Sequence, residues 1–206
     1  MELHPLAEAS GYLGSVLGVG MVVPQIVRTY RHRTMPGVSG MSWALMALAC
    51  FGWLLYGVRT AEVPQVPGNV LLVSGAVLLV LVVPSPYAVP SRAAALAAGG
   101  AALVVAAFVL PASVLGLVAF GIGLVSTIPQ TITSLTRRAP DSAVSLLAWA
   151  MRVASQTCWL LYALAVHDHV VTISALVLLT NALLILVTEK MRRTAPAPAP
   201  ALAVTP

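Results

Sequence analysis

The chain contains one sequence unit twice, and this duplication constrains the fold more than any other feature. The pair Pro24-Gln25 returns as Pro129-Gln130, 105 positions later. The run Trp-Leu-Leu-Tyr that begins at Trp53 returns at Trp159, 106 positions later. Two landmarks that recur in the same order and at nearly the same spacing indicate an internal repeat. The sequence therefore predicts a fold built from two similar bundles.

Composition indicates that these bundles lie in a membrane. Hydrophobic residues make up 59% of the 206 residues and charged residues only 8%, whereas about a quarter of a typical globular domain is charged. The net charge of +5 comes from basic residues that cluster between apolar runs, which is the pattern of membrane topology and not of a nucleic-acid-binding surface. We therefore expect an all-α, multi-pass protein of the plasma (cell inner) membrane, with the lipid bilayer and not nucleic acid as its surroundings.

The apolar runs divide the chain into seven expected spans. A spanning helix needs about 20 mostly apolar residues. The stretch 93–136 carries no charge and, at about 1.5 Å per residue, is long enough for two spans with Pro111 as the turn between them. The expected spans are 9–27, 34–58, 63–91, 93–110, 111–136, 144–166 and 170–188.

These spans predict a three-one-three arrangement of helices. The first three-helix repeat is expected at 6–91, a linker helix at 92–110, the second repeat at 111–190 and a disordered Ala/Pro-rich tail at 191–206. Nine of the 11 basic residues lie in connections on one side, and only Arg59 lies on the other. Because Lys and Arg gather on the cytoplasmic side, the amino terminus is expected outside and the carboxyl terminus inside. Each repeat then starts outside, so the two repeats are parallel.

The repeated motifs resemble those of the PQ-loop membrane proteins, and within them the SWEET sugar transporters and their half-length relatives, the SemiSWEETs. The resemblance covers about 11–189 and includes the three-one-three arrangement. In SemiSWEETs a Trp-x-x-Tyr-Gly motif is followed by an Asn, and here the motif beginning at Trp53 is followed sixteen residues later by Asn69. The second repeat departs from this pattern: Ala163 and Ala175 replace the Gly and the Asn, and Asn181 comes six positions too late.

The Pro-Gln pairs are expected to act as hinges, as the resemblance implies for Pro24, Gln25, Pro129 and Gln130. Proline removes a backbone donor and clashes with the carbonyl four residues earlier, which weakens a helix locally. The competing interpretation is a static packing kink. Because both prolines stand at equivalent positions and each precedes a Gln, we favour a hinge that moves.

The resemblance further implies a substrate pocket formed by Trp53, Asn69 and Trp159. The alternative for the tryptophans is a place in the aromatic belt at the membrane surface. Arg152 is a charge inside an expected span, which is costly and by default a functional hypothesis. It lies two helical turns before Trp159 and hence on the same helix face. We expect Arg152 to line the pathway, the alternative being a side chain that snorkels to the headgroups; its first-repeat equivalent is Met46.

An outer gate is expected where the second helix of each repeat ends. Tyr56 and Tyr162 lie one turn beyond the tryptophans, where they close the gate or sit in the aromatic belt. Arg59 and Glu62 resemble the Arg/acid pair that closes this gate in SemiSWEETs, and Asp168 is the second-repeat counterpart of Glu62. The histidines on either side of Asp168 have no further ligand pattern, so we expect a solvated loop and no metal site.

Together these features predict facilitative, SWEET-like uniport of a small neutral sugar by alternating access. No Asp or Glu lies in an expected span, whereas proton-coupled carriers generally place a carboxylate in the membrane. Two alternatives remain: a PQ-loop carrier of an amino acid or organic acid held by Arg152, or a non-transporting receptor or assembly protein. We expect no enzyme and no cofactor, since no nucleophile, base and orienting group converge. A monomer suffices for one pathway, and a homo-oligomer is compatible with it.

Overall fold

The protein is all-helical in the residues described by the computed structural model, which are 4–31, 40–82, 88–136 and 145–194. These ranges hold seven helices and no strand, which confirms the all-α class predicted from the sequence. The turn predicted at Pro111 is present between the fourth and fifth helices. In chain order the helices are α1 (His4–Arg31), α2 (Gly40–Thr60), α3 (Gln65–Val82), α4 (Val89–Val109), α5 (Ala112–Thr136), α6 (Leu146–Ala165) and α7 (His169–Thr194).

Six of these helices are long and apolar enough to cross a membrane, and α6 is the exception. Its sequence carries Arg152 and a polar group of Ser155, Gln156 and Thr157, and polar side chains lower the hydropathy that defines a span. The helix nevertheless packs between α1 and α7. Six spans are thus supported by composition, and the seventh stays a prediction.

Most helix ends differ from the expected span ends; the third helix, for example, ends at Val82 and not at residue 91. Helix α4 begins at Val89 with Pro90 in its first turn, a position where the missing proline N–H is not needed. Helix α7 continues through Thr194, so the expectation that the tail begins at residue 191 is wrong for 191–194. The rest of that tail, 195–206, lies outside the described residues, as do the basic residues Arg33, Arg137 and Arg138.

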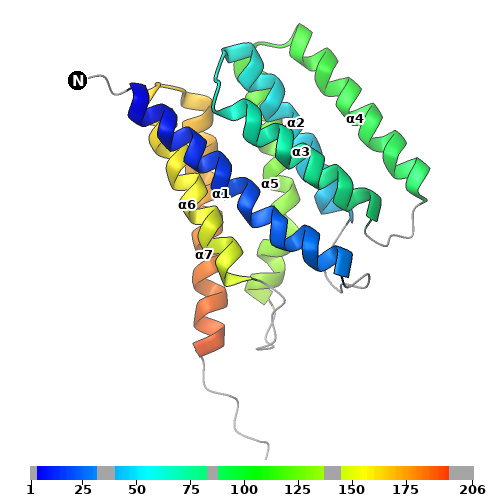
Figure 1. The fold of residues 1–206 in the computed structure, drawn as a ribbon, viewed down its shortest axis with the longest axis vertical. Coiled ribbons are helices and arrows are strands. Elements are labelled where there is room, and N and C mark those ends of the chain that lie inside the picture. Colours follow the sequence, from blue (N-terminus) through cyan, green and yellow to red (C-terminus); the bar gives the residue numbers. More distant parts are fainter. Residues whose placement is uncertain (1–3, 32–39, 83–87, 137–144, 195–206) are drawn as a thin grey trace, which may run out of the picture.

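Six helices form a closed ring, and the seventh lies outside it. Around the ring the contacts run α1–α3–α2–α5–α7–α6 and back to α1, while α4 packs mainly on α2. Figure 1 shows α4 at the edge of the molecule, and α1 beginning at the opposite end from that at which α7 finishes. Two helices of each repeat therefore touch the other repeat, through the α1–α6 and α2–α5 contacts.

The turns α2–α3 and α6–α7 have the same backbone, which confirms the register of the sequence repeat. Ala61 and His167, 106 positions apart, both have φ of 58°. The Glu62 N–H donates to the Gly57 carbonyl at 2.8 Å, and the Asp168 N–H donates to the Ala163 carbonyl at 2.9 Å. A left-handed residue followed by such a bond is a common way to end a helix. The same helix end is thus built twice.

Tyrosines and glycines pack across the two repeats in a matched way. Tyr56 is 4% exposed and Tyr162 2%. A Cβ added at Gly116 would lie 2.9 Å from the Tyr56 ring, and one added at Gly11 would lie 3.1 Å from the Tyr162 ring. Small residues let helices in a membrane approach closely. Each tyrosine therefore packs against the first helix of the other repeat, and neither belongs to an exposed aromatic belt.

Candidate functional site

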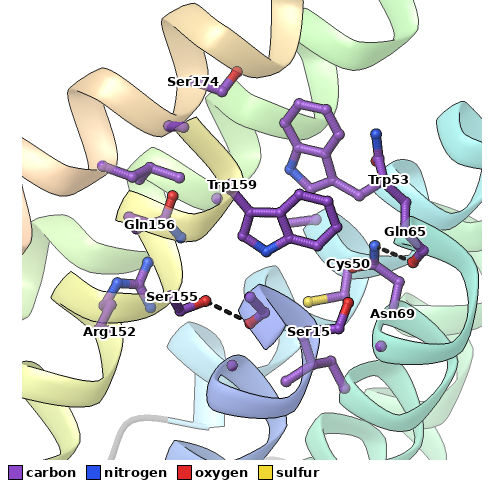
Figure 2. Close-up of a pocket in the computed structure, with 18 of the residues that line it drawn as sticks. Ser15, Cys50, Trp53, Gln65, Asn69, Arg152, Ser155, Gln156, Trp159 and Ser174 are labelled. Atoms are coloured by element: carbon purple, nitrogen blue, oxygen red, sulfur yellow. Dashed lines mark hydrogen bonds between the residues drawn. The ribbon is translucent and has the colours of Figure 1, made fainter. Parts of the chain in front are cut away.

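A cavity of about 130 Å³ lies inside the helix ring. Every ring helix contributes to it, and most of its wall is apolar. Figure 2 shows the two indole rings in its middle, with side chains of α6 on one side and of α3 on the other. The residues that line it include Ser15, Met46, Cys50, Trp53, Gln65, Asn69, Arg152, Ser155, Gln156, Trp159, Val171, Ser174 and Ala175.

The cavity lies between the two repeats. Its lining includes residues at equivalent positions, 106 apart in the chain, so the same part of each repeat faces the same space. Repeat-built transporters bind their solutes at such interfaces between repeats. Equivalent lining pairs are Met46 with Arg152, Cys50 with Gln156, Trp53 with Trp159, Gln65 with Val171 and Asn69 with Ala175.

The tryptophans of both repeats line this cavity and contact the tyrosine one turn later in the same helix. Trp53 meets Tyr56 edge to face, with ring centroids 5.5 Å apart and an interplanar angle of 86°. Trp159 meets Tyr162 in the same way, at 5.6 Å and 85°. Edge-to-face contacts of this kind fix ring orientation. Both indoles thus line the cavity within the ring of helices.

Two amides of α3 lie on one side of the cavity. The Asn69 Nδ2 donates to the backbone carbonyl of Gln65 at 2.8 Å, which orients the amide and leaves its oxygen as an acceptor for a ligand. Gln65 is 3% exposed, and its Nε2 has no hydrogen-bond partner among the described residues. Gln65 was not among the residues expected in the site, because the pair Pro64-Gln65 has no counterpart in the second repeat.

On the other side of the cavity, α6 contributes a guanidinium. Arg152 is half-buried, and its central carbon lies 5.7 Å from the ring centroid of Trp149. Within the described part of the chain Arg152 has no carboxylate partner. Gln156 follows it by one turn and lines the same wall. The structure thus places Arg152 in the cavity, as the pathway hypothesis requires.

Serine hydroxyls in the cavity wall are already used by the protein. Ser15 donates to the Pro64 carbonyl at 2.8 Å, and Ser155 donates to the Gly14 carbonyl at 2.7 Å. Ser174 donates to the carbonyl one turn earlier in its own helix, at 2.7 Å. These bonds hold α1 against α3 and α6 and leave no hydroxyl proton free for a ligand.

A direct hydrogen bond joins the two repeats at the predicted outer gate. The Tyr56 hydroxyl donates to Asp168 Oδ2 at 2.8 Å. The other carboxylate oxygen accepts from the N–H groups of Val170 and Val171, at 2.9 and 3.0 Å, and so caps α7. Arg59 instead donates to the Leu110 carbonyl at 2.6 Å. No group of three metal-ligating residues occurs in the described ranges.

One predicted hinge is described in full and the other only in its backbone. Pro129 lies inside α5, and the Gln130 Nε2 donates to Ser134 Oγ at 3.2 Å. Pro24 lies within the bounds of α1; the side chains of Pro24 and Gln25 are outside the described residues.

A buried carboxylate lies in α7, one residue after the expected end of the seventh span. Glu189 is 1% exposed and lies in the span-length helix α7. Its Oε1 accepts from Ser134 Oγ at 2.8 Å and lies 3.7 Å from Arg192 Nη1. The seventh span was expected to end at Thr188 because a charge follows. The contact with α5 buries this charge within the helix bundle. Glu189 does not line the cavity.

Comparison with known proteins agrees with this architecture. Residues 6–66 match the family model of the PQ loop repeat. A eukaryotic SWEET transporter, whose structure was determined at 3.7 Å resolution, superposes with a TM-score of 0.73 at 13% sequence identity, covering 92% of this chain and 100% of that chain. The search of curated proteins finds no match. The chain thus contains a match to the PQ loop repeat at 6–66, and its helices share the fold of a SWEET transporter.

Proposed function

We propose that the protein is a facilitative carrier that moves a small sugar across the plasma membrane by alternating access. The observation that carries this proposal is the cavity between the two repeats, lined by Trp53 and Trp159 from equivalent positions and by Asn69. A mostly apolar pocket with a few placed polar groups is typical of small-molecule sites.

The chemistry of the lining suits a sugar. The apolar C–H faces of a pyranose ring pack on indole faces, while the Asn69 carbonyl oxygen accepts from a hydroxyl. The cavity of about 130 Å³ is near the size of the ~150 Å³ cavity that admits one benzene ring. A hexose is larger, so it enters only when the bundle opens on one side.

Alternating access follows from the arrangement of the repeats. In this proposal α1–α3 and α5–α7 are parallel three-helix bundles joined by α4, corresponding to 6–91, 92–110 and 111–190, with the amino terminus outside. The bundles rock at the α1–α6 and α2–α5 contacts, and the weakened helix at each Pro-Gln pair absorbs the bend. One chain completes one pathway, so a monomer is the functional unit.

The outer gate in this scheme is the bond between Tyr56 and Asp168. It joins α2 of the first repeat to the start of α7 in the second, so the two bundles separate on the outside only when it breaks. Transport is assigned as uniport because no Asp or Glu lines the cavity in the described ranges, and Glu189 lies elsewhere on α7.

Counterflow in proteoliposomes tests the proposal. Vesicles are preloaded with unlabelled sugars, and labelled tracer is followed with and without an imposed pH gradient. We expect sugar exchange that ignores the gradient, and an Asn69→Ala carrier that retains only a small fraction of it. Ser74→Ala is the matched control, because Ser74 is an exposed polar residue of α3 outside the cavity. Silence for every solute in folded protein, or equal activity of the Asn69 variant, contradicts the proposal.

A further inference from the structure

We propose that the solute carries a carboxylate, which Arg152 binds, so that the carrier takes hydroxylated monocarboxylates of the sugar-acid class. This inference rests on the proposed transport function and narrows its substrate. It replaces the neutral sugar expected from the sequence, since the absence of acidic groups from the cavity argues against cations and not against anions.

The first argument is the charge of the cavity. Arg152 is the one ionised group in its described lining, and no Asp or Glu stands opposite to it. Its recorded contact is the face of Trp149 at 5.7 Å. A charge held away from water is costly unless an opposite charge pairs with it. A bound carboxylate supplies that charge, and its two oxygens match the planar fork of a guanidinium.

The second argument is the balance of donors and acceptors. The hydroxyls of Ser15, Ser155 and Ser174 already donate to backbone carbonyls. The Gln65 Nε2, in a side chain that is 3% exposed, has no partner within the described residues, and the Arg152 guanidinium has its N–H donors free of any recorded acceptor. The unmet groups of the wall are therefore mainly donors, and the ligand that satisfies them is rich in acceptors.

The third argument is the position of these groups. Figure 2 shows Arg152 and Gln156 on one side of the tryptophan rings and Gln65 and Asn69 on the other. The polar groups thus come from α6 of the second repeat and α3 of the first. A ligand that fits this wall has two unlike ends: a carboxylate at α6 and hydroxyls at α3.

Each of these four polar residues has an apolar or weakly polar residue at the equivalent position of the other repeat. The polar groups of the cavity therefore differ between its two sides. Met46 is the repeat equivalent of Arg152, and Cys50 is the repeat equivalent of Gln156. Val171 and Ala175 are the equivalents of Gln65 and Asn69. A neutral sugar needs no such division into a cationic and an amide side, whereas a hydroxy acid does.

The repeat symmetry supplies the test. The wild-type carrier is compared with Arg152→Met, with Arg152→Lys, and with the exchange Met46→Arg/Arg152→Met, which moves the guanidinium to the equivalent wall. The probes are two matched pairs, glycerate with glycerol and gluconate with glucose. Ligand-induced thermal shifts of purified protein report binding, and counterflow in proteoliposomes reports transport. Because Arg152 is half-buried and has no carboxylate partner in the described residues, we expect the protein to fold when an apolar methionine replaces it.

We expect the wild type to prefer each acid over its neutral partner. A hydrogen-bonded charge contributes about 1.5–3 kcal/mol, so Arg152→Met should lose roughly tenfold to a hundredfold in affinity for the acids and little for glycerol and glucose. Arg152→Lys should retain an intermediate preference, because the charge remains and the fork is lost. The exchange variant should regain part of it, which a purely structural or gating role of Arg152 does not predict.

Two failures are distinguishable. If the wild type exchanges or binds glucose as well as gluconate, and Arg152→Met changes neither, the carboxylate inference is wrong while the sugar carrier stands. If no solute is exchanged but the acids still shift the melting temperature through Arg152, the anion site stands and transport is refuted. If folded wild-type protein neither binds nor exchanges the acids, the inference is wrong.

Discussion

Loss of the Tyr56 hydroxyl should open the outer gate and expose the cavity to external reagents. The change Tyr56→Phe removes the 2.8 Å bond to Asp168 and keeps the ring against Trp53. A hydrogen bond to a charged group is worth about 1.5–3 kcal/mol. If that bond is made only when the gate is closed, the open population rises roughly tenfold to a hundredfold.

The protein contains its own reporter for this measurement. Cys50 lines the cavity and is 6% exposed, so a charged, membrane-impermeant thiol reagent added outside reaches it only through an open outer gate. Cys158, the other free cysteine, is first replaced by Ala; its backbone carbonyl, which accepts from Ser10, is retained.

The assay is the rate at which external reagent modifies Cys50 in intact vesicles. We expect Tyr56→Phe to raise this rate by the factor above, and the rate with reagent on the cytoplasmic side to fall, since the two open states compete. Asp168→Asn, which keeps an acceptor oxygen but not the charge, should give a smaller rise. Equal external rates in Tyr56→Phe and its parent would refute the assignment of this bond to the gate.

Two further changes test the packing that positions the cavity. Gly116→Ala puts a Cβ 2.9 Å from the Tyr56 ring and should lower the free energy of unfolding by about 1–3 kcal/mol; Gly121→Ala on the same helix, where a Cβ meets nothing within 4 Å, should leave it unchanged or raise it by up to about 1 kcal/mol. Thermal unfolding in one detergent compares them, and equal shifts contradict the contact. Glu189→Ala removes the acceptor of the buried Ser134 hydroxyl and should cost about 1–3 kcal/mol, whereas Glu189→Gln retains an acceptor and should cost less; the reverse order contradicts the assigned bond.

Much of the fold was predictable because its signals are local. Apolar runs of span length and the turn at Pro111 depend on the sequence alone, and the duplication gave the register that the matched φ of Ala61 and His167 confirms. Helix ends were less predictable. A hydropathy rule ends a span at the first charge. Glu189 is nevertheless buried within the helix bundle, where the Ser134 hydroxyl of α5 donates to its carboxylate.

The residues of the site also divide into those with a local sequence signal and those placed by contacts between helices. Trp53 and Asn69 were predicted from the motif of the family that the chain resembles, and Arg152 from its charge in an apolar run. Gln65 was missed because its burial depends on the close approach of α2 at Gly57, where a Cβ would lie 2.8 Å from the Gln65 Cβ. A contact between two helices of this kind leaves no periodic mark in the sequence.

The unequal repeats explain how a two-fold scaffold holds a solute with one charged end. An arginine at both equivalent positions would place two guanidinium groups in one cavity of about 130 Å³, and like charges disfavour each other there. Met46 opposite Arg152 avoids this repulsion and leaves a single anion site. Adding an arginine by Met46→Arg alone should therefore weaken folding or draw in a second anion, whereas the exchange with Arg152→Met should do neither. The preference for a carboxylate thus depends on one guanidinium in the shared cavity, and moving that group to the other repeat should keep only part of the preference.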